Sequence, residues 1–448
     1  MRAMQRYTFR HILTPDGMLH DRTLTVGPDG RIAAIEPSAA GAVLDGWLAL
    51  PGIPNAHSHA FQRALAGFGE ATNAPGRDSF WSWREAMYRL ALRVTPEQCG
   101  AIARHAFAEM LAAGYTSVAE FHYLHHLPEG PVDDGARGTE MAAAVIEAAR
   151  AVGIRLTLLP TLYVTGGFGR EAQPEQRRFL HASVDQYLGL VARLRPLLPD
   201  GRVGVAPHSL RAVPAELLAP LVAGARALLG ADAPLHVHVA EQTAEVEQCR
   251  AAHGCGPIAL LARHVELDTR WSLVHATHAD ARERALLRER GANLVVCPIT
   301  EAYLGDGLYP VEEQGSAGIA IGSDSNCRID ALAELRLLEY GARLRNRARA
   351  QLADERGLGA PLWSGAVAAG ARALGQPVAG LAVGQLADLV VVDERAPALA
   401  GHGIATALDA LLINGSARDL SATIVGGRRC TSTDTRAAYD AAVRELLP

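Results

Sequence analysis

Two short motifs carry histidines at spacings that suit a metal ion. His57 and His59 stand two residues apart in PNAHSHAFQR, and side chains two apart point to the same face of an extended chain. The segment LHVHVAEQ repeats this spacing with His236 and His238 and adds Glu241 three residues later. Imidazoles on one face can share one metal ion. A pair of hydrogen-bonded surface histidines gives the same pattern, so one pair alone does not establish a metal site.

Two further motifs supply acid and base groups. LVHATH places His275 at the end of an apolar run, and IGSDSN places Asp324 just beyond another. As the third histidine ligand we choose His238, because it lies nearer the carboxyl end of its run, whereas His236 would lie one layer deeper. Three histidines and a carboxylate, with other acid and base groups nearby, are typical of a catalytic zinc site that leaves one position open for water.

The basic residues of the chain are all arginines. Lysine and arginine together number 43 in 448 residues, and no lysine occurs. This excludes Schiff-base chemistry, a P-loop lysine and a carboxylated lysine that bridges two metals. The net charge of −5 argues against a nucleic-acid surface, and no apolar run approaches the roughly 20 residues that span a membrane. With a start too polar for a signal peptide, we expect a cytoplasmic enzyme with a small-molecule substrate.

The chemical groups need a scaffold that brings the ends of several strands together. Between residues 50 and 380, short apolar runs alternate with helical stretches, which is typical of βα units around a parallel sheet. We expect eight strands, near residues 48–56, 117–121, 155–161, 203–206, 234–239, 271–275, 293–297 and 319–322. Eight units favour an α/β fold with a closed (β/α)8 barrel of the TIM type over the alternative, an open doubly wound sheet. Active sites of such barrels lie at the carboxyl ends of the strands.

Both ends of the chain have a different pattern. Residues 1–49 alternate apolar and polar residues between Asp-Gly turn signals, and residues 386–393, 410–415 and 422–429 are further β-rich segments that end in turn residues. The simplest arrangement pairs residues 1–49 with residues 381–448 in one small composite β domain. This domain would lie beside a barrel of residues 50–380.

The order of these motifs resembles that of the amidohydrolase superfamily. Its barrels carry an HxH motif after strand one, single histidines after strands five and six, and an aspartate after strand eight. In its deaminase branch, which uses one metal ion, a glutamate follows the strand-five histidine by three residues, as Glu241 follows His238 here. Branches with two metal ions commonly bridge them with a carboxylated lysine after strand four, where this chain has His208.

Within that superfamily, the chain most closely resembles the formimidoylglutamate deiminase family of histidine degradation. The resemblance rests on PNAHSHAFQRALAG, SFWSWREAMYR, AEFHYLHH, PHSLRAV, HVAEQ and GSDSNCRIDALAELRLLEYGARLR. It implies an enzyme that hydrolyses N-formimidoyl-L-glutamate, a dicarboxylate amidine, to N-formyl-L-glutamate and ammonia. A homodimer is the usual expectation for the oligomeric state.

The resemblance also implies roles for single residues. One zinc ion per subunit would be bound by His57, His59, His238 and Asp324. A bound zinc ion lowers the pKa of water towards about 7 and so supplies a nucleophile for the formimidoyl carbon. Asp324 is expected to accept the proton of that water, and Glu241 to protonate the leaving nitrogen. His275 is expected to stabilise the tetrahedral intermediate or to orient the nucleophile.

Substrate binding must deal with two carboxylates, and in this chain only arginine can supply a cationic bidentate clamp. The resemblance selects two arginines for this role, and three further residues are expected to add hydrogen bonds. The five predicted substrate-binding residues are Gln62, Arg84, Tyr123, His208 and Arg211. The tryptophans beside Arg84, Trp81 and Trp83, are expected to be packing residues rather than stacking platforms.

Two rival functions stay open at this stage. Another deaminase of the superfamily, acting on a nucleobase or a guanidino compound, would use the same metal ligands but would not need paired arginines. A zinc-binding barrel without catalytic activity would have lost some of the ligands, whereas every expected position is filled in this chain.

Overall fold

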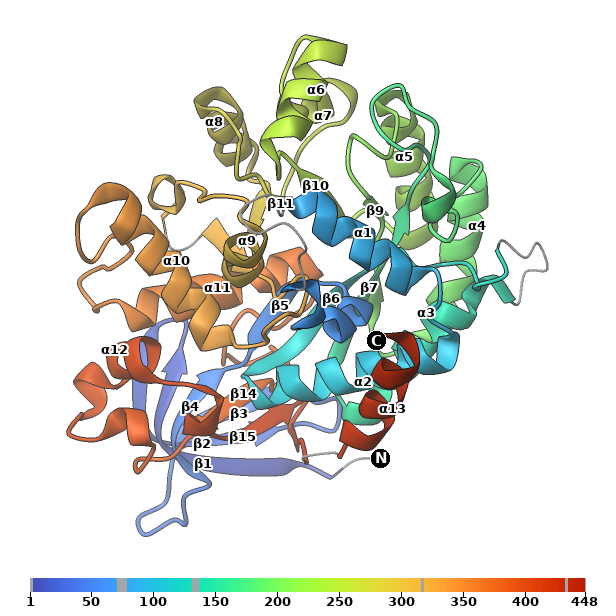
Figure 1. Cartoon of the computed structure of the whole chain (residues 1–448). Helices are drawn as coiled ribbons and strands as arrows, with labels where there is room; N and C mark the ends of the chain where they lie inside the picture. Colours follow the sequence, from blue (N-terminus) through green and yellow to red (C-terminus); the bar gives the residue numbers. More distant parts are fainter. Residues whose placement is uncertain (1–2, 71–78, 131–136, 316–317, 432–433, 448) are drawn as a thin grey trace.

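The chain is built around a curled parallel sheet with helices on its outside (Figure 1). The computed structural model describes residues 3–70, 79–130, 137–315, 318–431 and 434–447. One arc of the sheet contains β5 (Ile53–Ser58), β6 (Tyr115–His122), β7 (Arg155–Leu162) and β8 (Arg202–Val203), and β9 (Ala206–Pro207) also pairs with β7. The other arc contains β10 (Leu235–Val239), β11 (Trp271–His275), β12 (Asn293–Val296) and β13 (Ile319–Ile321).

The two arcs meet on both sides and close the sheet into a barrel. A parallel bridge joins Ser209 to His238 on one side, and another joins Ser58 to Asp324 on the other. The strands within each arc are parallel, and β8 and β9 together occupy the fourth position. The predicted (β/α)8 barrel is therefore confirmed.

Helices surround the barrel and cover its ends. They are α1 (Phe80–Ala91), α2 (Pro96–Ala112), α3 (Glu140–Val152), α4 (Val184–Leu194), α5 (Leu218–Leu229), α6 (Thr243–His253), α7 (Pro257–His264), α8 (Ala281–Arg290), α9 (Pro298–Leu304), α10 (Ala331–Asn346) and α11 (Gly359–Leu374). Capping residues mark helix starts. At the start of α2, for example, the Thr95 hydroxyl accepts a hydrogen bond from the backbone N–H of Gln98. Among the described residues, no helix is both long and apolar enough to cross a membrane.

The first predicted strand, residues 48–56, is in fact two strands in two different sheets. The segment is divided into β4 (Gly46–Pro51) and β5, with Gly52 between them. A Cβ atom on Gly52 would lie 2.2 Å from Cγ2 of Thr116, so only glycine allows the chain to pass so close to β6. The prediction missed this break because a continuous apolar run does not show where a chain leaves one sheet and enters another.

Both ends of the chain contribute to a second sheet, as expected. Its strand order is β16-β15-β14-β4-β1-β2-β3. The strands are β1 (Gln5–Thr14), β2 (Gly17–Val26), β3 (Ile32–Pro37), β4, β14 (Leu389–Val392), β15 (Leu420–Val425) and β16 (Arg428–Arg429). The N-terminal β4 pairs antiparallel with the C-terminal β14. Side chains from both ends of the chain, including Phe9, Leu24 and Ile424, form a small hydrophobic core within this second sheet.

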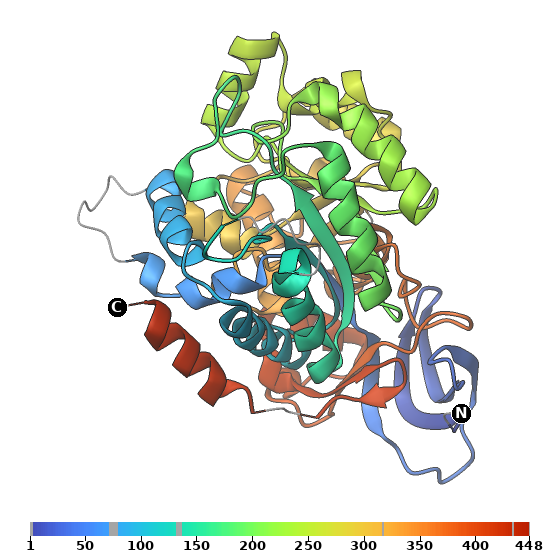
Figure 2. The same cartoon turned by 90° about the vertical axis from the view of Figure 1, so that its right-hand side faces the viewer.

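The C-terminal part of the chain is more helical than predicted. Residues 410–415 were expected to be a strand, but residues 410–414 form the end of α12 (Ile404–Asn414), which packs on α10 and α11. A short buried apolar run fits a strand and a buried helix equally well, and here packing decides. The last helix, α13 (Arg436–Leu446), lies against α2 of the barrel rather than on the second sheet (Figure 2). The domain boundaries at residues 49/50 and 380/381 stay a prediction.

Candidate active site

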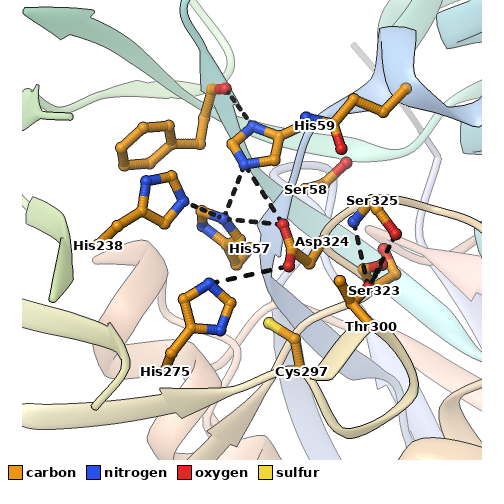
Figure 3. A network of polar contacts seen from close by, with 12 residues as sticks. His57, Ser58, His59, His238, His275, Cys297, Thr300, Ser323, Asp324 and Ser325 are labelled. Carbon is orange, nitrogen blue, oxygen red and sulfur yellow. Dashed lines mark hydrogen bonds and ion pairs between the residues drawn. The ribbon is translucent and has the colours of Figure 1, made fainter. Parts of the chain in front are cut away.

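Four buried side chains converge where the barrel strands end (Figure 3). His57 lies in β5, His59 follows it, His238 lies in β10 and Asp324 follows β13. Nε2 of His57 lies 3.1 Å from Nε2 of His59 and 2.9 Å from Nε2 of His238. Oδ1 of Asp324 lies 3.4 Å from Nε2 of His57 and 3.3 Å from Nε2 of His59. The four predicted metal ligands are thus brought together.

These separations fit a metal ion at their centre. Zinc binds imidazole nitrogen at about 2.0–2.1 Å in tetrahedral geometry, which places neighbouring ligand atoms about 3.3 Å apart. The ligand atoms of the four side chains all lie within 4.8 Å of one another. Three ring nitrogens at such distances need a proton or a cation between them, because unprotonated nitrogens repel through their lone pairs. The donor set therefore suits one zinc ion.

The surroundings of the histidines favour their neutral, metal-binding form. Nδ1 of His59 donates to the carbonyl oxygen of Phe121 at 2.9 Å, and Nδ1 of His238 donates to that of His208 at 3.0 Å. These bonds leave Nε2 free to bind a metal. Burial lowers the pKa of His57 to about 3 and also lowers the pKa values of His59 and His238. Neutral imidazole is the form that binds a metal.

His236, the other histidine of LHVHVAEQ, lies outside this set. It is fully buried, and its Nε2 donates to the carbonyl oxygen of Ala373 in α11 at 2.7 Å. Burial lowers the pKa of His236 to about 4. It is a hydrogen-bonded core histidine, and the deeper position expected for it agrees with this contact.

A second possible ligand group overlaps with the first. His275, Cys297 and Asp324 also bring their ligand atoms within 4.8 Å of one another. Burial and the nearby carboxylates of Asp324 and Glu301 raise the pKa of the Cys297 thiol well above its usual value, which opposes the thiolate form that binds metals. Asp324 belongs to both groups, so a single ion would use one of them. The group with three histidines is the better metal site, because it does not depend on the Cys297 thiol.

Three side chains form the face on which a substrate would react. Nε2 of His275 lies 3.9 Å from Oε1 of Glu241 and 3.8 Å from Oδ2 of Asp324. The backbone is strained at the same strand ends, since φ is positive at Ala240 (51°), His275 (70°), Ala276 (51°) and Asp324 (46°). Non-glycine residues in this region cost about 1–3 kcal/mol each and cluster at functional sites.

The carboxyl groups of this face have opposite pKa shifts. Burial raises the pKa of Glu241, although nearby positive groups oppose this. Burial also acts to raise the pKa of Asp324, but the surrounding imidazoles outweigh it and hold that pKa below its usual value. For His275, burial acts to lower the pKa, yet the hydrogen bond to Glu301 and the charges of Glu241 and Asp324 raise it to about 10. A carboxyl that favours its acid form beside one that favours its ionised form is suited to acid–base work.

All five predicted substrate-binding residues line one pocket with the reacting face. The five residues are Gln62, Arg84, Tyr123, His208 and Arg211. Other side chains of α1 also line this pocket. Nε2 of Gln62 donates to the hydroxyl of Tyr123 at 2.6 Å. The carbonyl of His208 holds the ligand His238, so His208 serves the site through its backbone as well.

The two arginines of the pocket are held in different ways. The Arg84 guanidinium lies 4.5 Å from the ring centre of Trp81 and 5.4 Å from that of Tyr88. Trp81, expected only to pack, therefore supports Arg84 by a cation–π contact. Arg211 lies between carboxylates, with its Nη2 3.1 Å from Oε2 of Glu241 and its Nε 3.6 Å from Oε2 of Glu245.

Sequence reasoning missed two buried glutamates that hold the site. Oε1 and Oε2 of Glu245 accept hydrogen bonds from the backbone N–H groups of Ala240 and Glu241, respectively. Oε1 of Glu301 lies 3.2 Å from Nδ1 of His275. Each glutamate stands in the first turn of the helix that follows a barrel strand. That position was visible in the sequence, but an acidic residue at a helix start is usually explained by the helix dipole alone.

Comparison with known proteins agrees with this architecture. The model of the amidohydrolase family matches residues 48–430. A formimidoylglutamate deiminase of Pseudomonas aeruginosa is 44% identical over 444 residues, which cover 97% of this chain and 96% of that protein. A 5-methylthioadenosine/S-adenosylhomocysteine deaminase of Natronomonas pharaonis is 33% identical, covering 93% and 90%. The crystal structure of an amidohydrolase from Brucella melitensis has a TM-score of 0.91 and 39% identity, covering 99% of this chain and 100% of the other.

Proposed function

We propose, from the premise that this chain belongs to the amidohydrolase family, that it hydrolyses N-formimidoyl-L-glutamate to N-formyl-L-glutamate and ammonia. The observation that carries the proposal is the composition of one pocket. Two arginines, Arg84 and Arg211, line the same pocket as the ligands and the acid–base groups. A dicarboxylate amidine carries the two kinds of group that such a pocket can bind. The Pseudomonas aeruginosa relative, which carries the name of this activity, supports the same substrate.

The proposal includes one zinc ion per subunit, bound by His57, His59, His238 and Asp324. Bound zinc supplies the Lewis acidity that activates water at neutral pH. The side chains then move the protons. Asp324, whose pKa is held low, accepts one proton of the attacking water, and Glu241, whose pKa is raised, donates one to the nitrogen that leaves. The second proton of the water leaves its oxygen as the formyl C=O forms and completes the ammonia, so that the water supplies both protons. His275 faces both carboxylates and would orient the attacking water or stabilise its oxygen as that oxygen bonds to the formimidoyl carbon.

Arg84 and Arg211 are proposed to bind the two carboxylates of the glutamate moiety. Gln62, Tyr123 and His208 are proposed to add hydrogen bonds. In this proposal the charged end of the substrate would lie beside α1, and the amidine would lie at the metal. A cytoplasmic homodimer working in histidine degradation completes the proposal.

The rival functions fit the pocket less well. The 33% identical relative is named for a deaminase of adenine nucleosides, and such substrates offer at most one carboxylate, that of a homocysteine moiety, whereas two arginines line this pocket. A guanidino compound shares the amidine-like group and stays the nearest alternative. A barrel without activity is disfavoured, because the metal ligands and the acid–base groups are all in place.

An ammonia-release assay tests the proposal directly. Purified protein is offered N-formimidoyl-L-glutamate, other formimidoyl-amino acids, guanidino acids and adenine nucleosides. We expect N-formimidoyl-L-glutamate to have the highest kcat/KM. A guanidino acid or a nucleoside in first place would overturn the proposed substrate while leaving the enzyme in its family.

Metal removal gives a separate prediction. Elemental analysis is expected to find about one zinc ion per chain, because one group of three histidines and an aspartate fits it and no lysine is present to bridge two ions. Protein treated with a chelator should lose its activity and regain it with one equivalent of zinc. Two ions per chain at full activity, or full activity in verified metal-free protein, would contradict the mechanism with a single metal.

A further inference from the structure

A buried carboxylate lies directly behind His275. Oε1 of Glu301, in α9, lies 3.2 Å from Nδ1 of the imidazole, and both residues are almost completely buried. The same oxygen accepts a hydrogen bond at 3.0 Å from the backbone N–H of Cys297, at the end of β12. One oxygen atom thus ties the end of β11 to the end of the neighbouring strand.

We propose that Glu301 is a positioning residue that aims the His275 imidazole at the reacting face, an inference that rests on the proposed function. An ionised carboxylate can only accept hydrogen bonds, so Nδ1 of His275 must carry a proton when it bonds to Glu301. Nε2 then points the opposite way, to within 3.9 Å of Glu241 and 3.8 Å of Asp324. Glu301 is absent from the residues that line the pocket, so it acts through His275 and does not touch the substrate.

The backbone of His275 gives a reason why such support is needed. His275 and Ala276 have φ values of 70° and 51°, a region that L-residues rarely adopt. A strained turn persists only where its surroundings hold it. The bond from Cys297 fixes the Glu301 carboxylate, and the carboxylate in turn fixes the ring. Carboxylate partners of metal-binding histidines typically account for 10- to 100-fold in metal affinity or activity, and we expect an effect of similar size behind His275.

The chain offers a matched control in Glu334. This residue is also fully buried, and its Oε2 accepts a hydrogen bond at 2.8 Å from the backbone N–H of Ile299 in the same helix, α9. Within the described part of the chain, Glu334 forms no hydrogen bond or ion pair with His275. Glu334→Gln therefore makes the same chemical change near the same helix without touching the imidazole.

The kinetic test compares Glu301→Ala, Glu301→Gln and Glu334→Gln in the zinc-loaded enzyme. We expect Glu301→Ala to lower kcat for N-formimidoyl-L-glutamate about 10- to 100-fold, with KM within about twofold and zinc content unchanged. Glu301→Gln keeps an oxygen that can accept both hydrogen bonds, so its kcat should lie between those of Glu301→Ala and the wild type. Glu334→Gln should stay within about twofold of wild type. Loss of zinc in Glu301→Ala, or a raised KM at unchanged kcat, would overturn the proposal.

A double variant separates a positioning role from a merely structural one. If Glu301 acts only through His275, adding Glu301→Ala to His275→Ala should lower kcat no further. An equal additional loss in that background would show that Glu301 acts elsewhere.

A measurement that needs no substrate keeps this inference independent of the proposed function. In protein labelled with ¹⁵N-histidine, the Nδ1–H of His275, assigned by its loss in His275→Ala, should give a hydrogen-bonded, downfield proton signal. We expect Glu301→Ala to remove this signal and Glu334→Gln to keep it. Survival of the signal in Glu301→Ala would refute the contact, whereas failure of the wild type on N-formimidoyl-L-glutamate would refute only the substrate.

Discussion

Glu241→Gln is expected to lower kcat roughly 10²- to 10⁴-fold while zinc content stays at the wild-type level. The amide keeps the shape of the side chain but cannot deliver a proton to the leaving nitrogen. Glu241 is suited to that delivery because it is buried, its pKa is raised, and its Oε1 lies 3.9 Å from Nε2 of His275 on the reacting face. It is not among the four metal ligands, so the amide should leave the zinc in place.

Two comparison variants make this result specific. His238→Ala removes a ligand and should lose zinc together with activity. Glu247→Gln makes the same chemical change at an exposed position of α6, the helix that follows Glu241, and should leave kcat and zinc content unchanged. Zinc content by elemental analysis and kcat from ammonia release give both readouts. Near-normal turnover of Glu241→Gln with the correct substrate would remove Glu241 from the proton-transfer step.

The four candidate metal ligands could be selected from the sequence because their spacing reflects local geometry. His57 and His59 lie on one face of one extended segment, and the distance of Glu241 from His238 is set by one strand end. The choice of His238 over His236 followed from depth along a strand, and the contact of His236 with Ala373 agrees with it. The eightfold alternation of strands and helices was equally local, and so the barrel was predictable.

Contacts between distant segments were not predictable in the same way. Arg211 pairs with Glu241, and His275 pairs with Glu301. Each pair joins segments at the ends of two different strands, and the periodicity of one segment does not predict its contact with the other. The helix at residues 410–414 was missed for a related reason. Its apolar run suits either structure, and packing against α10 and α11 selects the helix. Tertiary contacts determine these features, so they emerge only in the folded chain.

The pocket also leads to a strong substrate preference: kcat/KM for N-formimidoyl-L-glutamate should exceed that for formimidoyl-glycine by at least about 10²-fold. The glycine derivative lacks the side-chain carboxylate, so one of the two arginines would be left in the occupied pocket without its partner. An unpaired buried charge costs more than the lost contact alone. The loss should affect Arg84 more than Arg211. Among the described residues no carboxylate pairs with Arg84, whereas Arg211 already contacts Glu241 and Glu245.

The two arginine variants should therefore differ. Arg84→Met is expected to raise KM for N-formimidoyl-L-glutamate about tenfold or more with a smaller change in kcat, since Arg84 is held by cation–π contacts to aromatic rings of α1 and forms no ion pair with the acid–base groups of the described chain. Arg211→Met should lower kcat as well, because it leaves the buried carboxylates of Glu241 and Glu245 without their cation. Lysine at either position should rescue only in part, because an ammonium lacks the planar fork that meets two carboxylate oxygens.

Steady-state kinetics on both substrates decide whether the arginines form a dicarboxylate clamp. Arg89→Met, at an exposed position of the same helix as Arg84, is the matched control and should behave like the wild type. Zinc content should be unchanged in all these variants, because no arginine belongs to the ligand set. The variant that loses the partner of the side-chain carboxylate should discriminate least between the glutamate and glycine derivatives, since both substrates then lack that contact. Equal kcat/KM on the two substrates in the wild type would refute the clamp and favour a guanidino or nucleobase substrate for the same metal centre.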